Sequence, residues 1–265
     1  MTAVIEDKND NIINNLLDDF YKYMQSCNEA KDEGGYYSNG IHCSSLGACK
    51  RKVIMEYFNF PKLPYNLPTL LQFEGGNHIH HVVRKWINSS DRFEILHEEF
   101  DVSKGLPEPI VGRCDLVFKD KLTNEIVLAD TKSAAAKQFT HFKDSLPKDN
   151  HIIQLTAYGY GLKQLGINYD KMCIMYFDRG GANKPLIYFV KEYADIEGLM
   201  NEYILAWLRH DQDKILPPKL TDKKDFWQCS YCSFMGISCE GYIEQENEFS
   251  TWVTEENKKE QKRKK

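Results

Sequence analysis

Hydrophobic and polar positions along the chain follow two periods, and their order predicts a mixed α/β domain. Apolar residues recurring every three to four positions predict helices over residues 10–26, 70–88, 150–165 and 196–208, with a shorter one ending before Pro61. Short apolar runs bounded by polar turns predict strands over 93–102, 110–118, 125–129, 172–177 and 186–190. Residues 135–149 fit a short helix and a loop. This order is typical of a mixed sheet flanked by helices.

The helix predicted over 70–88 contains three histidines within four positions. Its apolar positions indicate a core face made of Ile79, Val82, Val83 and Trp86. His78 and His81 fit solvated positions on the helix surface. Gly76 and His80 are four residues apart and therefore share one side of the helix. His80 is a candidate metal ligand provided that other elements complete a site.

The strands over 110–118 and 125–129 both have a carboxylate that a core strand does not need. Asp115 lies inside the first run, and Asp130 ends the second, with Lys132 two residues later. Because side chains alternate along a strand, Asp130 and Lys132 point one way and Thr131 the other. Two acids with one amine at the edge suit a divalent metal bound by carboxylate oxygens. A surface hairpin with an incidental salt bridge is the alternative.

Composition narrows the class of protein. The chain has 265 residues and is 42% apolar and 28% charged, which is ordinary for a globular protein. Its net charge of −5 argues against a protein coated in nucleic acid but is compatible with local binding of phosphates through metal ions and a few lysines. No apolar run approaches the roughly 18 residues of a membrane span. The polar, acidic N-terminus does not resemble a signal peptide, so we expect a cytoplasmic protein. Without export, eight cysteines indicate metal ligands or free thiols rather than disulfides.

Three of the cysteines follow the spacing C-x2-C-x6-C, which is a strong metal-ligand pattern. They are Cys229, Cys232 and Cys239. A tetrahedral site needs a fourth ligand, and the upstream candidates are Cys27, Cys43, Cys49, Cys114 and Cys173. Cys49 is favoured because it begins a helix among basic residues that lower a thiol pKa. Cys43, in a flexible-looking loop, is the reserve.

These observations divide the chain into three parts. Residues 1–44 form an N-terminal helix and loop, and residues 45–240 form the main domain, in which 217–240 is the cysteine segment. Residues 241–265 are a charged tail that cannot fold alone.

The ordered motifs resemble those of the PD-(D/E)XK nucleases of the RecB type that contain an iron–sulfur cluster. That group includes CRISPR-associated RecB-like exonucleases, the nuclease domain of the AddB helicase subunit and viral relatives. The matching pieces are SSLGACKRK around Cys49, G-x3-H ending at His80, GRCDLV at Asp115, LADTK at Asp130–Lys132, Q-x3-Y at Gln154–Tyr158, and the cysteine trio. The family's second acid is often Glu, whereas here it is Asp130.

The resemblance implies a restriction-endonuclease-like core and a role for each motif residue. His80, Asp115 and Asp130, with the backbone carbonyl of Thr131, would bind Mg²⁺ or Mn²⁺. Lys132 would orient the attacking water or stabilise the charge on phosphorus. Gln154 and Tyr158 would position DNA or the lysine, and Cys49, Cys229, Cys232 and Cys239 would bind a 4Fe–4S cluster that ties the N-terminal and C-terminal segments together.

The expected function is that of a metal-dependent DNA exonuclease acting on DNA ends, with single-stranded termini preferred, in recombination, repair or replication. DNA is the expected partner, together with recombination, replication or CRISPR-type proteins, in the host cytoplasm if the protein is viral. An endonuclease of the same superfamily, a non-catalytic DNA-end-binding iron–sulfur protein, and a zinc or redox protein are the alternatives.

Overall fold

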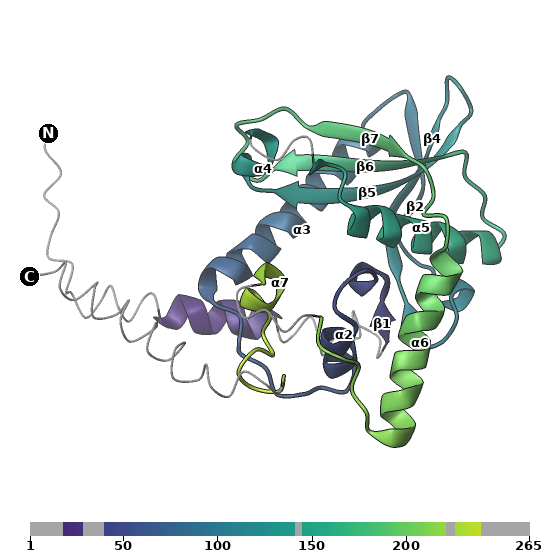
Figure 1. The fold of residues 1–265 in the computed structure, drawn as a ribbon. Coiled ribbons are helices and arrows are strands. Elements are labelled where there is room, and N and C mark those ends of the chain that lie inside the picture. Colours follow the sequence, from purple (N-terminus) through teal and green to yellow (C-terminus); the bar gives the residue numbers. More distant parts are fainter. Residues whose placement is uncertain (1–17, 29–39, 141–144, 221–225, 240–265) are drawn as a thin grey trace, which may run out of the picture. The chain divides into compact units, whose positions relative to one another are not determined.

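The computed structural model describes residues 18–28, 40–140, 145–220 and 226–239. The chain divides into two compact units, and both are made of segments distant in sequence. The first contains residues 1–47 and 65–204, and the second contains 48–64 and 205–265 (Figure 1). The proposed metal-site motifs all fall in the first unit, and the four cysteines of the expected cluster fall in the second.

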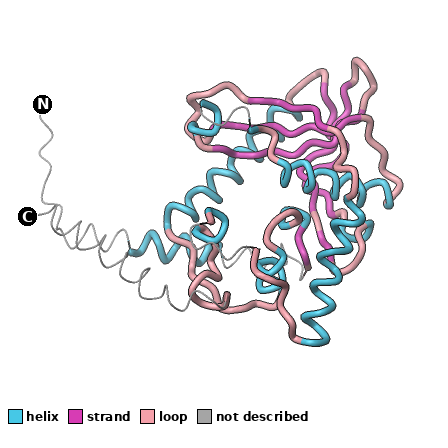
Figure 2. The backbone as a smooth tube through the Cα atoms, in the orientation of Figure 1, coloured by secondary structure: helices cyan, strands magenta, loops and turns pink. Residues whose placement is uncertain are grey.

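A five-stranded mixed sheet forms the centre of the first unit. Its strands are β2 (Phe93–Asp101), β4 (Arg113–Asp120), β5 (Ile126–Ala134), β6 (Lys171–Asp178) and β7 (Leu186–Val190), in the order β2-β4-β5-β6-β7. They are labelled in Figure 1 and drawn in magenta in Figure 2. β5 and β6 run parallel, and the other neighbours are antiparallel. A separate parallel pair joins β1 (Ile41–His42) to β3 (Ile110–Val111). The mixed α/β architecture predicted from the apolar periods is confirmed.

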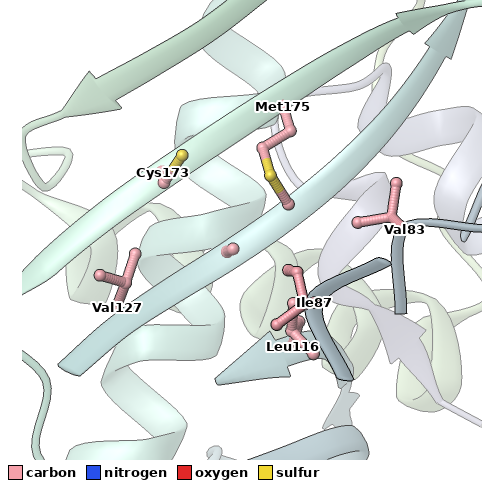
Figure 3. Close-up of a cluster of buried hydrophobic side chains, with 7 residues drawn as sticks. Val83, Ile87, Leu116, Val127, Cys173 and Met175 are labelled. Atoms are coloured by element: carbon pink, nitrogen blue, oxygen red, sulfur yellow. The ribbon is translucent and has the colours of Figure 1, made fainter. Parts of the chain in front are cut away.

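Two helices pack on opposite faces of the sheet. α3 (Leu67–Asn88) buries Val83 and Ile87 against Leu116, Val127, Ala129, Cys173 and Met175 (Figure 3). α5 (Asp149–Gln164) contacts the side chain of Lys132. Because side chains alternate along a strand, Lys132 points to the face of β5 opposite to the one that α3 covers. The odd-numbered residues of β5 thus complete the core under α3, and Asp130 and Lys132 face α5.

The predicted core face of α3 is wrong at two positions. Val82 and Trp86 are about half exposed, whereas Val83 and Ile87 are buried. The sheet-facing stripe therefore passes one position later along the helix than the prediction placed it. The helix also starts at Leu67, where Asn66 accepts a hydrogen bond from the Thr69 N–H at 2.9 Å. Two adjacent apolar stripes were compatible with the sequence, and packing on the sheet selected one.

β5 continues five residues beyond the predicted end at Ala129. Its parallel partner β6 pairs with it through Ala134, opposite Asp178. Because β6 supplies backbone partners there, the strand contains polar residues that an apolar run could not reveal. Asp130 and Lys132 consequently lie within a strand, on a fixed backbone, rather than in a loop after it.

The second unit brings the segment after Ala48 together with the C-terminal segment. It contains α2 (Lys50–Tyr57), the end of α6 (Ile196–Asp213) and α7 (Trp227–Ser230). Arg51 Nη1 donates to the Pro217 carbonyl at 2.9 Å, and the Leu63 N–H donates to the Ser233 carbonyl at 2.8 Å. The rings of Phe58 and His210 lie 4.4 Å apart. Side-chain and backbone hydrogen bonds thus join the segment after Ala48 to the C-terminal segment, and Phe58 packs on His210 of α6.

The remaining described elements are short. Residues 18–28 are helical, so part of the helix predicted over 10–26 is present and the rest lies outside the described residues. Two 3-10 turns, η1 (Cys43–Ser45) and η2 (Ser103–Gly105), and the short α4 (Ala136–Thr140) complete the set. The charged tail over 241–265 also lies outside the described residues. Among those that are described, no helix is long and apolar enough to cross a bilayer.

Candidate active site

The two acids of the candidate site come from neighbouring antiparallel strands. The β4–β5 ladder ends where Leu116 lies opposite Ala129, so Asp115 and Asp130 occupy the next position on each strand. The backbone N–H of Thr131 donates a hydrogen bond to Oδ2 of Asp115 at 2.8 Å. The carboxylate of Asp115 is therefore bound to the strand that contains Asp130.

His80 joins these acids from α3. One turn before it, a Cβ added at Gly76 would lie 3.2 Å from Ser133 Oγ, so glycine allows α3 to approach β5 closely. His80 Nδ1 lies 3.2 Å from Oδ2 of Asp115. Burial lowers the pKa of His80, against the opposing effect of the Asp130 charge, so the imidazole is neutral at neutral pH, the form that binds metals.

The carboxylate of Asp130 is buried without a hydrogen-bond partner. Both of its oxygens are shielded from solvent, and neither makes a hydrogen bond with the described residues. Lys132 Nζ lies 2.8 Å from Oδ2 as an ion pair. Burial raises the pKa values of Asp130 and of Asp115 to about 6, although Lys132 opposes both shifts. A buried anion with unsatisfied oxygens is costly unless a cation compensates it.

A chain of hydrogen bonds fixes Lys132 from α5. Lys132 Nζ donates to Gln154 Oε1 at 2.7 Å, and Gln154 Nε2 donates to the hydroxyl of Tyr158 at 2.7 Å. Gln154 and Tyr158 are both buried, one turn apart on α5. Burial raises the pKa of Tyr158, so its hydroxyl stays protonated. Gln154 of the predicted Q-x3-Y pair therefore contacts Lys132, and Tyr158 contacts Gln154.

The donor set suits a hard divalent ion. Two carboxylates and one neutral imidazole match the ligands that Mg²⁺ and Mn²⁺ take in proteins. The unsatisfied oxygens of Asp130 are the observation in favour of such a cation. Within the residues that the structure describes, no group of three or more His, Cys, Asp or Glu side chains already converges on one point. The Asp130 carboxylate instead lies against Lys132.

Three charged residues near the site were not predicted from the sequence. Glu99 on β2 pairs with Arg84 on α3 and, at 3.0 Å, with Arg113 on β4. Glu99 also has a positive φ of 46°, which is unusual for a residue with a side chain. Arg84 lies one turn after His80 and Arg113 two residues before Asp115, a spacing that places them beside the ligands. The position of Glu99 near the site follows only from the pairing of β2 with β4.

His151 is a second residue that sequence reasoning missed. It lies three residues before Gln154, so both share one face of α5. Its Nδ1 lies 2.7 Å from the hydroxyl of Tyr176 on β6. The i, i+3 spacing of His151 and Gln154 in the sequence could have indicated that the two share a helix face.

The structure separates the cysteines into two groups. Cys43 is fully buried in η1, where a Cβ added at Gly112 would lie 2.7 Å from its Sγ. The prediction that Cys43 lies in a flexible loop is therefore wrong, and burial raises its pKa, which disfavours the thiolate. Cys114 and Cys173 are buried strand residues, as the sequence indicated.

Cys49 lies at the N-cap of α2, in the same unit as the C-terminal trio. Burial raises the pKa of Cys232, and nearby Cys239 and Cys49 raise it further. Cys49 and Cys239 thus lie close enough to Cys232 to affect its thiol. Cys229 begins the tight turn in which the Cys232 N–H donates to its carbonyl at 3.0 Å.

A family model now identifies the fold around this site. The model of the PD-(D/E)XK nuclease superfamily matches residues 74–239, more than half of the chain. The chain belongs to the PD-(D/E)XK nuclease superfamily. The superfamily comprises hydrolytic nucleases, and its name describes a pattern that this member follows at Asp130-Thr131-Lys132. Before Asp115 this member has Cys114 where the name has proline.

The solved structures to which this chain is similar are distant in sequence. The crystal structure of SSO0001 is 16% identical, with a TM-score of 0.50 over 80% of this chain and 92% of that chain. An alkaline exonuclease (LHK-Exo) from Laribacter hongkongensis is 11% identical, with a TM-score of 0.44 over 66% and 94%. LHK-Exo in complex with dAMP gives 12% and 0.46 over the same shares. No curated protein matches the sequence.

Proposed function

We propose that this superfamily member is a metal-dependent DNA exonuclease that hydrolyses phosphodiester bonds from DNA ends and prefers single-stranded termini. The observation that supports it best is the buried, unsatisfied carboxylate of Asp130, which lies beside an ammonium and next to Asp115 and His80. The Lys132 ammonium lies against Oδ2, whereas Oδ1 is buried with no hydrogen-bond partner among the described residues. A bound cation would compensate that oxygen.

The residues that would bind Mg²⁺ or Mn²⁺ are His80, Asp115, Asp130 and the backbone carbonyl of Thr131. When bound, the metal supplies Lewis acidity toward the phosphate oxygens and lowers the pKa of a coordinated water. Asp115 is oriented for this task by the Thr131 N–H, and His80 is neutral because of burial. The oriented carboxylate and the neutral imidazole are thus ready to bind a metal ion without rearrangement.

Lys132 has a separate task. Its ammonium is fixed by Asp130 and Gln154, so it stands at one place beside the acids rather than sampling solvent. From there it can orient the attacking water by hydrogen bonding and stabilise the negative charge that develops on the phosphate oxygens. Gln154 sets the position of the ammonium, and Tyr158 sets the orientation of the Gln154 amide.

We further propose that the chain is of the RecB type with a 4Fe–4S cluster bound by Cys49, Cys229, Cys232 and Cys239. Three observations support it: the C-x2-C-x6-C spacing, the position of Cys49 at a helix N-terminus, and the proximity of Cys49 and Cys239 to Cys232. Zinc is the alternative metal. Iron and sulfide analysis of anaerobically purified protein, with absorbance near 400 nm as the resemblance implies, distinguishes them.

The proposed pathway rests on the resemblance rather than on the site. We propose that the protein acts on DNA in recombination, repair or replication, alongside recombination, replication or CRISPR-type proteins in the cytoplasm.

One digestion experiment tests the proposed reaction. End-labelled linear DNA, single-stranded and double-stranded, and closed-circular DNA are incubated with Mn²⁺, with and without excess chelator. We expect mononucleotides or short products from the ends of the linear substrates, intact circles, and no cleavage in chelator. Lys132→Ala serves as the control for contaminating nucleases. Efficient cutting of closed circles would make the protein an endonuclease, and full activity in chelator would refute the metal site.

A further inference from the structure

His151 lies near Lys132, on the helix that holds the Lys132 ammonium. Tyr176, to which His151 Nδ1 is hydrogen bonded at 2.7 Å, is the register partner of Lys132 on the parallel strands β5 and β6. His151 also shares a face of α5 with Gln154, which accepts a hydrogen bond from Lys132. The charge of Lys132 contributes to a lowered pKa at His151, as expected for groups that lie close together.

The hydrogen bonds around Tyr176 assign the tautomer of His151. The backbone N–H of Lys148 donates to the hydroxyl oxygen of Tyr176 at 3.2 Å. Tyr176 is 1% exposed, so its own O–H proton needs an acceptor within the protein, and His151 Nδ1 is the atom in place. A neutral imidazole that accepts at Nδ1 has its proton on Nε2. Burial, followed by the charges of Lys132 and Lys148, keeps the ring neutral by lowering its pKa to about 3.

The Nε2–H of His151 is therefore an available donor. Over the described parts of the chain, His151 is engaged through Nδ1 and ring contact with Tyr176, and no hydrogen bond or ion pair engages Nε2. A DNA backbone phosphate offers acceptors and no donors at neutral pH. A neutral N–H donor can contact such a phosphate without adding a second positive charge that would repel the Lys132 ammonium.

We propose that His151 is a phosphate-contacting residue whose Nε2–H donates to a nonbridging oxygen of the DNA backbone next to the scissile bond. This inference rests on the proposed nuclease function and adds a substrate contact to the same site. A competing role is packing alone, in which His151 fixes Tyr176 and so the backbone beside Lys132. The two roles differ in whether the Nε2 donor itself matters.

A matched pair of substitutions separates these roles. In His151→Gln the side-chain amide can place a donor near the former Nε2, whereas in His151→Asn it reaches the Nδ1 position and the Tyr176 contact but not the phosphate. For cleavage of single-stranded DNA with Mn²⁺, we expect kcat/KM to fall about tenfold in His151→Asn and less than about threefold in His151→Gln. A loss in His151→Gln equal to or larger than the loss in His151→Asn would indicate packing alone, because Asn keeps the Tyr176 contact, and would overturn the phosphate contact. His78→Phe, at an exposed position of α3, is the control.

Substrates with one neutral phosphate test the contact directly. A series of single-stranded oligonucleotides, each with a methylphosphonate at one position, is cleaved by wild-type protein and by His151→Asn. In the wild type, one position near the scissile bond should show a loss that the variant no longer shows, because the contact has already been removed. An identical pattern in both proteins would overturn the proposal.

The same experiment separates failure of this inference from failure of the proposed function. If wild-type protein cleaves DNA and the methylphosphonate pattern does not depend on His151, the nuclease function stands and the contact is wrong. If wild-type protein cleaves no DNA, the proposed function is wrong. The methylphosphonate series, measured then as binding affinity by fluorescence anisotropy, still decides whether His151 contacts a phosphate.

Discussion

Lys132 Nζ lies 2.8 Å from Oδ2 of Asp130, two positions earlier on the same side of β5. The alternation of side chains along a strand brings the two together, and burial makes each dependent on the other. The pair compensates only part of the charge in the site, because Asp115 is a second buried acid. The protein without metal therefore stores unfavourable electrostatic energy where a cation would bind.

Removing the ammonium should abolish cleavage while the fold persists. In Lys132→Ala, the Asp130 carboxylate loses its cation, and its already raised pKa allows it to take up a proton instead. We expect kcat to fall by roughly three orders of magnitude, with circular dichroism unchanged and a Tm within a few degrees of the wild type. If Lys132→Ala unfolds, the ion pair is structural, and the site assignment is wrong.

Neutralising Asp130 should stabilise the metal-free protein in a manner that depends on pH. Burial raises the pKa of Asp130 to about 6, above the value near 4 of an unfolded chain, so this residue's favourable contribution to stability is complete below pH 4 and is lost as the pH rises through 6. In chelator at pH 8, Asp130→Asn should be more stable than wild type by on the order of 1 to 3 kcal/mol.

The difference should shrink toward zero at pH 4, as measured by denaturant unfolding across this range. Added Mg²⁺ should stabilise the wild type and leave Asp130→Asn unchanged, because the variant lacks a ligand. A variant that is less stable than the wild type at pH 8 would contradict the electrostatic account.

Gln154 should affect turnover more than DNA binding. Gln154→Leu removes the acceptor of Lys132 and the donor to Tyr158, so the ammonium is positioned by Asp130 alone. We expect kcat to fall about 10- to 100-fold with little change in KM. Tyr158→Phe, which frees only the Gln154 amide, should cause a smaller loss, and steady-state kinetics on one labelled oligonucleotide compares the two. An increase in KM alone would make Gln154 a DNA contact instead.

The cysteine variants should separate cluster binding from packing. Cys49→Ser should lose iron and most of the thermal stability, since ligation would join both segments of the second unit. Cys43→Ala should keep its iron but lose about 1 to 2 kcal/mol, because Cys43 is fully buried against Gly112. Iron and sulfide analysis, together with thermal melts, measures both effects. Undiminished iron in Cys49→Ser would show that another residue completes the ligand set.

Much of the site was predictable because its residues lie on regular elements. The apolar periods located β4 and β5, and alternation along a strand placed Lys132 on the same side as Asp130, where the ion pair forms. The i, i+4 spacing placed Gln154 and Tyr158 on one face of α5, where they share a hydrogen bond. Local geometry of this kind follows from the backbone period and needs no knowledge of distant contacts.

The sequence by itself determined the strand and helix order, the alternation that pairs Asp130 with Lys132, and the cysteine spacing. Only the tertiary structure decided that Val83 rather than Val82 faces the sheet, that β5 extends to Ala134, and that Glu99 joins Arg84 to Arg113. These features depend on which strand lies beside which and on which helix face the sheet covers. Periodicity along one segment specifies how its side chains are directed, whereas their partners are fixed only when distant segments pack.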